Sequence, residues 1–242
     1  RTFPYFRNAV TFQPLPWLEG VIRYVSVENR LYGPQSFSGN QSLKDKGFDA
    51  KIRLLEESSA FPQVVVGIRD IAGTGLYSGE YLALSRRYYD FDFTLGLGWG
   101  YLGSRGHFKN PMASLFSSFK NRNNVVGQGG TLSQQYFHGE SISLFGGVTY
   151  QTPIPGLVVK LEYDGNDYQS EPQNNNQKVT SPFNLGLTYS HGNWLDLSVG
   201  IERGNALMAQ LAFHGNLHKG IGMPKLDPPA ERVVARDLSF PA

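Results

Sequence analysis

Three carboxylates in one short stretch could take part in catalysis or bind a metal ion. Glu162, Asp164 and Asp167 lie close together, and paired carboxylates can hydrolyse glycosidic bonds or bind Ca²⁺. On a β-strand, Glu162 and Asp164 would share one face, with their Cα atoms about 7 Å apart. Any polar strand produces this spacing by chance, so we favour an ion-pair network with Arg69, Arg86 or Arg203.

Arginines offer a second chemistry, because their guanidinium forks bind carboxylates. They could form a basic surface for an acidic polysaccharide or pair with the chain's own carboxylates, and both can hold at once. A carboxylate paired with Arg stays ionised and does not suit a general acid, so we expect glycan contact rather than catalysis. The expected ligand-binding residues are Arg69, Asp70, Arg86, Glu162, Asp164, Asp167, Tyr168 and Arg203.

Local signatures of enzymes are absent from the sequence. Neither Gly-x-Ser-x-Gly nor His-Glu-x-x-His occurs, although a triad assembled across strands would be invisible in one sequence. The glycine-rich run at 73–79 lacks the dinucleotide-binding spacing. Because the chain has no Cys, disulfides and thiolate zinc sites are excluded. We therefore expect no catalytic residue, no metal site and no cofactor.

Composition narrows the function classes further. With 22 Lys and Arg against 20 Asp and Glu, the 242-residue chain has a net charge of +2, too little for a nucleic-acid-binding face. The longest aliphatic run, 64–66, is far shorter than the roughly 18 residues of a membrane-spanning helix. The 28 Gly, with 13% aromatic and 17% charged residues, favour many strands with aromatic bands.

Hydrophobic periodicity predicts the strands. Over 90–102, apolar residues alternate without a break with small or polar ones, which is the period of a β-strand. The same alternation recurs along the chain and is weaker upstream. It predicts eleven strands, at about 5–13, 17–27, 47–56, 63–70, 80–88, 90–102, 141–150, 157–164, 183–189, 195–202 and 206–213.

The lengths of the connections predict the topology. Short connections follow the odd-numbered strands, and long ones follow the even-numbered strands, with 203–205 as a short exception. Transmembrane barrels place short turns on the periplasmic side and long loops outside. The expected fold class is therefore all-β, an antiparallel up-and-down transmembrane β-barrel of about 11–12 strands.

The two faces of the predicted strands favour a membrane barrel over a soluble β-sandwich or lectin-like fold. The polar face carries Gly, Ser, Thr, Asn and Asp with few long charged chains, which fits a narrow interior. The apolar face is expected to contact lipid through Leu95, Leu97, Leu144, Val159, Leu161, Leu185, Leu187, Leu197 and Val199. Interfacial girdles are expected from aromatic residues near strand ends, namely Phe91, Tyr101, Tyr150, Tyr163, Phe183, Tyr189 and Phe213.

The ends of the strand region and its longest connection carry further expectations. The first strand begins on the long-connection side, so we expect either a preceding strand, making twelve, or an open seam between the first and last strands. Residues 1–213 should form the barrel segment, and 214–242, which contains four Pro, a periplasmic linker. The connection 103–140 has helical spacing over 111–120 and could be a plug, a lid or a surface loop.

Six short segments form a specific combination, although each alone is a weak motif. They are 16–20, 44–49, 67–75, 92–100, 160–168 and 200–205. With them, nearly the whole chain resembles the YjbH family of Gram-negative exopolysaccharide biogenesis proteins, which are outer-membrane lipoproteins. The resemblance implies β-barrel segments in the outer membrane, a role in secreting or assembling an extracellular polysaccharide, and periplasmic and export partners. Family members are longer, so the chain resembles their amino-terminal barrel portion.

The expected function is therefore that of a non-catalytic outer-membrane protein that assists exopolysaccharide secretion by guiding or binding the polymer. Its partners would be outer-membrane lipids, the polysaccharide and export proteins. The alternatives are an outer-membrane or periplasmic hydrolase acting on glycan or lipid, and a soluble β-sandwich carbohydrate-binding module. In the first reading, the expected ligand-binding residues gather at the long-connection mouth or on the inner wall.

Overall fold

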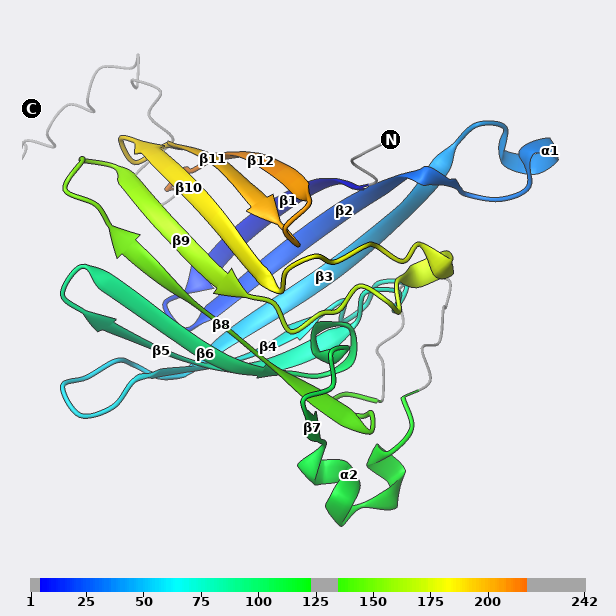
Figure 1. The fold of residues 1–242 in the computed structure, drawn as a ribbon, viewed down its shortest axis with the longest axis horizontal. Coiled ribbons are helices and arrows are strands. Elements are labelled where there is room, and N and C mark those ends of the chain that lie inside the picture. The colour runs from blue at the N-terminus through cyan, green and yellow to red at the C-terminus, as the bar shows by residue number, and fades with distance from the viewer. Residues whose placement is uncertain (1–4, 123–134, 217–242) are drawn as a thin grey trace, which may run out of the picture.

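The computed structural model describes residues 5–122 and 135–216, which form one antiparallel meander (Figure 1). All eleven predicted strands are present, in sequence order, and each pairs with its neighbours in the chain. The strands of the meander are β1 (Tyr5–Leu15), β2 (Leu18–Leu31), β3 (Ser42–Leu55), β4 (Gln63–Arg69), β5 (Gly79–Tyr88), β6 (Phe91–Gly98), β8 (Ser141–Gln151), β9 (Leu157–Tyr163), β10 (Phe183–His191), β11 (Leu195–Glu202) and β12 (Ala206–Phe213). The connections contain β7 (Phe108–Lys109), which pairs with β8, and the helical turns α1 (Gln35–Ser38), η1 (Gly100–Gly103), α2 (Pro111–Leu115), η2 (Ser117–Phe119) and η3 (Pro172–Asn174).

The alternation of the sequence gives the sheet its two faces. Where β5 pairs with β6, Leu84 lies opposite Leu95 and both side chains are exposed on the outer face. The next pair, Ser85 and Thr94, joins its hydroxyls across the strands at 2.9 Å on the inner face. Because successive side chains point to opposite sides of a strand, the curled sheet has a polar inner face and an apolar outer face.

Short connections lie at one end of the strands and long ones at the other, as the sequence predicts (Figure 1). The hairpin of β2 and β3 is longer than predicted and carries α1 at its tip. Pairing continues to Val27 opposite Leu43, beyond the start predicted for the third strand. The charged residues Lys44 and Lys46 alternate with Leu43 and Asp45, so this part of β3 lacks the apolar period on which the prediction depended.

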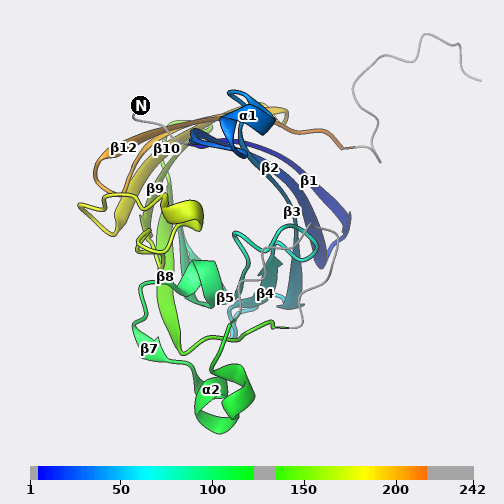
Figure 2. The ribbon, with the colours of Figure 1, turned by 90° about the vertical axis from the view of Figure 1, so that its right-hand side faces the viewer.

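The sheet curls without closing. Figure 2 shows β1–β4 facing β8–β10, and in the described part of the chain β1 and β12 form no ladder with each other. The expectation of an open seam is therefore confirmed, whereas a closed barrel is not seen. The twelfth strand of the sheet is β7, inside the longest connection. Residues before Tyr5 and most of the predicted linker, 217–242, lie outside the described residues.

The outer face remains uncovered along most of the meander. Of the residues expected to contact lipid, six are exposed, from 44% for Leu187 to 57% for Val199, and Leu97, Leu144 and Val159 are half-buried. A β-sandwich would bury such a face against a second sheet, but the strands here form one continuous sheet. No helix among the described residues is long and apolar enough to span a bilayer.

Beyond η1, the described part of the longest connection packs on the outside of the sheet at the long-connection end. Glu80 and Ile142 lie in the outward register of β5 and β8, yet they are 0% and 3% exposed because this connection covers them. Its described part contains the helical turn expected over 111–120, as α2. Over those residues it is a covering segment on the outer wall, neither a plug nor a lid.

The prediction that Tyr101 belongs to an outward aromatic girdle is wrong. β6 ends at Gly98, and Gly100 adopts a positive φ of 59° that starts the turn η1. The chain therefore leaves the strand period before Tyr101, whose ring meets Tyr77 edge to face at 5.2 Å. By contrast, Phe91, Phe183, Tyr189 and Phe213 are exposed as expected.

Candidate functional site

The β4–β5, β6–β8 and β9–β10 connections meet inside the long-connection end of the curled sheet, and Glu171 lies where they join. Its Oε2 accepts a hydrogen bond from the Tyr5 hydroxyl of β1 at 2.5 Å, and its Oε1 accepts one from Tyr101 of η1 at 2.7 Å. Glu171 itself belongs to the β9–β10 connection and is 4% exposed. One buried carboxylate thus ties together segments that are distant in sequence.

The β9–β10 connection also reaches β2. Asn175 and Asn29 exchange side-chain amide hydrogen bonds of 2.8 and 3.1 Å, and Arg30 donates to the Asn174 carbonyl at 3.1 Å. β2 belongs to the first part of the meander, and β9 and β10 belong to the last part. This connection therefore crosses the mouth and holds the two sides of the open sheet together.

A tyrosine–arginine cluster lines this mouth from the side of β4. The Arg69 guanidinium stands 5.5 Å from the centre of the Tyr101 ring, within the range of a cation–π contact. Burial raises the pKa of Tyr77 to about 12, and the negative charge of Glu171 adds to the rise. Burial, with the same carboxylate, raises the pKa of Tyr101 well above its usual value. Both phenols therefore stay neutral at physiological pH, and that of Tyr101 donates a hydrogen bond to Glu171.

The opposite side of the mouth holds a second tyrosine, Tyr168. Its hydroxyl donates to Asp164 Oδ2 at 2.7 Å, and the Arg203 guanidinium lies 4.9 Å from its ring centre. Burial raises the pKa of Tyr168, and the negative charge of Asp164 acts in the same direction. The backbone of Asn166 donates to Asp164 Oδ1 at 2.9 Å, which forms an Asx turn at this position.

A cavity of about 480 Å³ lies next to Tyr168 on the inner face of β6 and β8–β11. Glu162, Asp164 and Glu202 line it together with Asn184 and Tyr168, so it brings together three of the predicted ligand-binding residues. Carboxylates and amides of this kind accept and donate hydrogen bonds to hydroxyl groups. The aromatic rings in the same wall belong to Tyr81 and Phe145, whose centres are 6.1 Å apart.

Glycines in the neighbouring strands make room for these two rings. A Cβ on Gly96 would lie 2.3 Å from Cζ of Phe145, and one on Gly67 would lie 2.2 Å from the Tyr81 ring. Each ring therefore covers a glycine of the neighbouring strand, so Gly96 makes room for a bulky inner side chain. Aromatic rings beside hydrogen-bonding groups form a surface of the kind that binds sugar rings.

The remaining predicted residues are held by structural contacts. Asp70 is 3% exposed beneath the β4–β5 connection, and Tyr77 N–H reaches its Oδ2 at 3.4 Å. Burial raises the pKa of Asp70, with Asp45 as a second cause. Asp167 accepts from Ser104 Oγ at 3.1 Å and from the Gln169 backbone at 3.0 Å, which closes its loop.

Arg86 is not at the mouth, so the expectation that all the charged residues gather there is wrong for it. It lies in the outward register of β5, opposite Phe93, and donates to the carbonyl of Ser59 in a short connection at 2.7 Å. The reason is that Arg86 lies three positions after Ala83, which faces inward and is buried, and an odd offset along a strand places a side chain on the opposite face. Arg86 therefore sits on the outer face at the opposite end of the strands.

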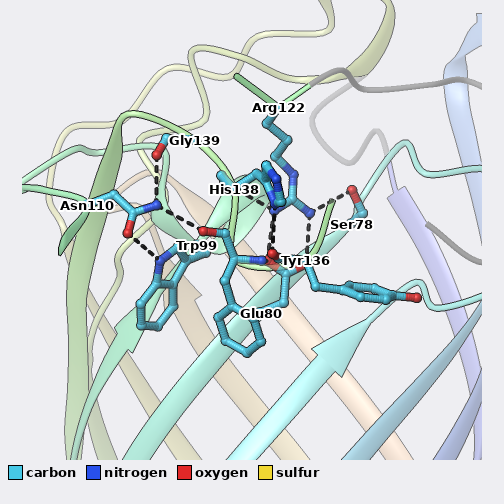
Figure 3. A network of polar contacts seen from close by, with 9 residues as sticks. Ser78, Glu80, Trp99, Asn110, Arg122, Tyr136, His138 and Gly139 are labelled. Atoms are coloured by element: carbon cyan, nitrogen blue, oxygen red, sulfur yellow. Dashed lines mark hydrogen bonds and ion pairs between the residues drawn. The ribbon is translucent and has the colours of Figure 1, made fainter. Parts of the chain in front are cut away.

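A buried polar network fixes the covering segment on the outside of the same rim (Figure 3). Arg122 forms a bidentate ion pair with Glu80, at 2.8 and 2.9 Å, and also donates to Ser78 Oγ at 3.0 Å. Asn110 accepts from the Trp99 indole at 3.3 Å and donates to the carbonyls of Phe137 and Gly139 at 2.9 and 2.8 Å. These contacts tie the covering segment to β5 and to the chain just after β6.

Sequence reasoning missed Tyr5, Tyr77, Tyr101 and Glu171 as members of the mouth. Tyr5, Tyr77 and Tyr101 all lie near strand ends, which is a signal that could have found them, but strand ends also supply outward girdles. Glu171 is a single carboxylate in a polar loop and carries no local signal. In the described ranges, no three His, Cys, Asp or Glu side chains are arranged to hold a metal ion.

Comparison with known proteins gives two matches. The family model described as exopolysaccharide biosynthesis protein YbjH matches residues 1–239. The lipoprotein YjbH of Escherichia coli K12 is 47% identical over 216 residues, which is 88% of this chain and 31% of that protein. The chain thus spans about a third of the length of this relative. No solved structure matches the chain.

Proposed function

Because the chain belongs to the YjbH family of exopolysaccharide biosynthesis proteins, we propose that it is a non-catalytic outer-membrane β-sheet protein that binds and guides an exopolysaccharide. The observation that carries the proposal is the combination of an exposed apolar outer face with a polar cavity and mouth on the inner face. The polymer would contact the inner face, and the outer face would contact lipid.

The outer face supports the membrane part of the proposal. Exposed side chains such as Leu95 at 56% and Leu185 at 52% would be costly in water but suit the hydrocarbon of a bilayer. The long connections would face outward from the cell and the short ones the periplasm. The name of the E. coli relative calls that protein a lipoprotein, which agrees with a membrane-attached protein.

The cavity supports the glycan part. Hydroxyl-rich polymers are bound by groups that exchange hydrogen bonds and by aromatic faces. Glu162, which has no hydrogen-bond partner in the described residues, and the side-chain N–H groups of Asn184 are available in the cavity for hydroxyls, while Phe145 and Tyr81 supply the rings. The Asn184 Oδ1 already accepts from the Arg203 backbone at 2.8 Å. At the mouth, Arg69 and Arg203 add positive charge beside tyrosine rings.

The contacts of the carboxylates support binding rather than hydrolysis. Asp164 already accepts hydrogen bonds on both of its carboxylate oxygens, from the Tyr168 hydroxyl and from the Asn166 backbone. A carboxylate whose two oxygens are occupied in this way is not placed to protonate a glycosidic oxygen, which is the role of the general acid in glycoside hydrolysis.

The test compares luminal variants for polysaccharide release and for hydrolysis. Glu162→Gln and Asp164→Asn in the full-length protein should lower secreted polysaccharide several-fold, with no hydrolysis of purified polymer by the parent protein. Asp167→Asn is the matched control, because Asp167 does not line the cavity and its carboxylate accepts from Ser104 and from the Gln169 backbone. Polymer hydrolysis that is lost in Glu162→Gln and Asp164→Asn would overturn the proposal and establish the hydrolase instead.

A further inference from the structure

The outer face of the sheet is hollowed across β5, β6, β8 and β9 by an apolar groove of about 610 Å³. Its centre is Gly146, which the ladders place between Leu95 of β6 and Tyr163 of β9. A Cβ at Gly146 would lie 2.6 Å from the carbonyl oxygen of Thr94, so a larger residue cannot fill the hollow. Side chains of Leu144 and Val148 bound the groove along β8.

A single cation, Arg86, lines this groove near the short-connection end. It is exposed, its only hydrogen bond among the described residues goes to the Ser59 carbonyl, and none of the ion pairs found there includes it. The aromatic residues Tyr88, Phe91 and Tyr150 form the next row toward the short connections. An arginine without a carboxylate partner, between an apolar groove and an aromatic row, is placed to bind a phosphate group.

We propose that this groove binds one glycerophospholipid, with an acyl chain over Gly146 and the lipid phosphate on Arg86. The inference rests on the membrane location proposed above, but it does not depend on the polysaccharide. The apolar lining selects an acyl chain over a free phosphate ion, and the guanidinium selects an anionic head group over an uncharged one. Because Arg86 lies near the short connections, the lipid belongs to the periplasmic leaflet.

Native mass spectrometry of the full-length protein in detergent tests the inference. The protein is titrated with dioleoyl phosphatidylglycerol, with dioleoylglycerol, which has the same chains and no phosphate, and with glycerol 3-phosphate, which has no chains. The parent should retain phosphatidylglycerol in preference to both. Arg86→Gln should weaken retention about tenfold, as expected for a lost charge-assisted hydrogen bond, and Arg86→Lys should restore part of it.

Two further variants separate the groove from general charge and from misfolding. Arg87→Gln removes a neighbouring cation that follows Arg86 on the opposite face of β5 and should leave retention unchanged. Leu95→Trp crowds the groove at an exposed position and should lower retention of phosphatidylglycerol and dioleoylglycerol together. Equal retention by the parent and Arg86→Gln, or equal losses in Arg86→Gln and Arg87→Gln, would overturn the inference. Binding of glycerol 3-phosphate as tight as that of the lipid would also overturn it, whatever the secretion assay shows.

Discussion

Burial sets the protonation state of the tyrosine side chains at the mouth. Glu171 accepts hydrogen bonds from two tyrosines that come from different parts of the chain. The phenols beside it stay neutral because their ionised form is poorly solvated there. Tyr77 is 3% exposed. In this arrangement Tyr5 and Tyr101 donate hydrogen bonds to Glu171, and the Tyr77 ring packs against that of Tyr101.

The raised pKa of Tyr77, about 12, predicts a loss of stability at alkaline pH. The folded state keeps the phenol proton to higher pH than the unfolded chain, whose tyrosine pKa is about 10. The folded state thus binds more protons over this range, so stability falls as pH rises from about 10 through 12. Chemical unfolding at about pH 9 and about pH 11 should show a pH-dependent loss that is smaller by about 1 kcal/mol in Tyr77→Phe.

Tyr101 and Tyr168 also have raised pKa values, so part of the alkaline loss should remain in Tyr77→Phe. Tyr89, which is 79% exposed in a short connection, supplies the control. An alkaline loss identical in the parent, in Tyr77→Phe and in Tyr89→Phe would contradict the role assigned to burial.

At the scale of the elements, strands position most residues of the cavity, whereas connections position those of the mouth. The β4–β5 connection packs Asp70 against the chain where it turns at Gly73, and the covering segment is fixed to β5 by Glu80 and Arg122. Both contacts depend on a close fit of buried polar groups, which is costly to disturb.

Gly73→Ala should destabilise the β4–β5 connection. A Cβ there would lie 1.7 Å from Asp70 Oδ1 and 2.6 Å from the Lys46 carbonyl oxygen, so the buried carboxylate and the backbone must both shift. We expect a loss of about 1–3 kcal/mol in the free energy of unfolding. Gly186→Ala is the control, since its nearest neighbour would be 3.7 Å away. Similar unfolding curves for the two variants would show that this fit is not tight.

Arg122→Met should loosen the covering segment. It leaves Glu80, which is 0% exposed, without its ion-pair partner, and an unpaired buried charge costs about 3–5 kcal/mol. Limited proteolysis should then cleave the 99–140 connection faster than in the parent. The double variant Glu80→Met with Arg122→Met should recover most of the resistance, because neither charge remains. Equal sensitivity of the single and double variants would argue against the unpaired charge as the cause.

For the whole molecule, the separation of a polar inner face from an apolar outer face sets how it can function. The curled, open sheet has no covered hydrophobic interior between two layers, and its small buried cluster comprises Val25, Val27 and Leu43, with Tyr5 packed against it. Most of its apolar surface points outward. Stability of such a sheet should therefore depend on a lipid-like surrounding.

Leu187→Arg tests this dependence. Leu187 is 44% exposed on the outer face of β10, and an arginine near the bilayer midplane costs about 2–4 kcal/mol. Unfolding in liposomes should show this loss, whereas Gln210→Arg on the inner face of β12 should show little. If Leu187→Arg is as stable as the parent in liposomes, this part of the outer face does not contact the hydrocarbon.

The sequence by itself determined the strands, their antiparallel order and the two faces, because these depend on local alternation and on connection length. The unbroken alternation around Leu95 sets both the strand and its outward side chains.

The residues that meet at the site follow only from the tertiary structure. Sequence spacing gathers Glu162 and Asp164, but Glu171 meets Tyr5 only because a connection crosses the mouth. Alternation also broke at Gly100, where a positive φ turned Tyr101 inward. Contacts between segments distant in sequence follow from the curvature of the sheet, which no local pattern encodes.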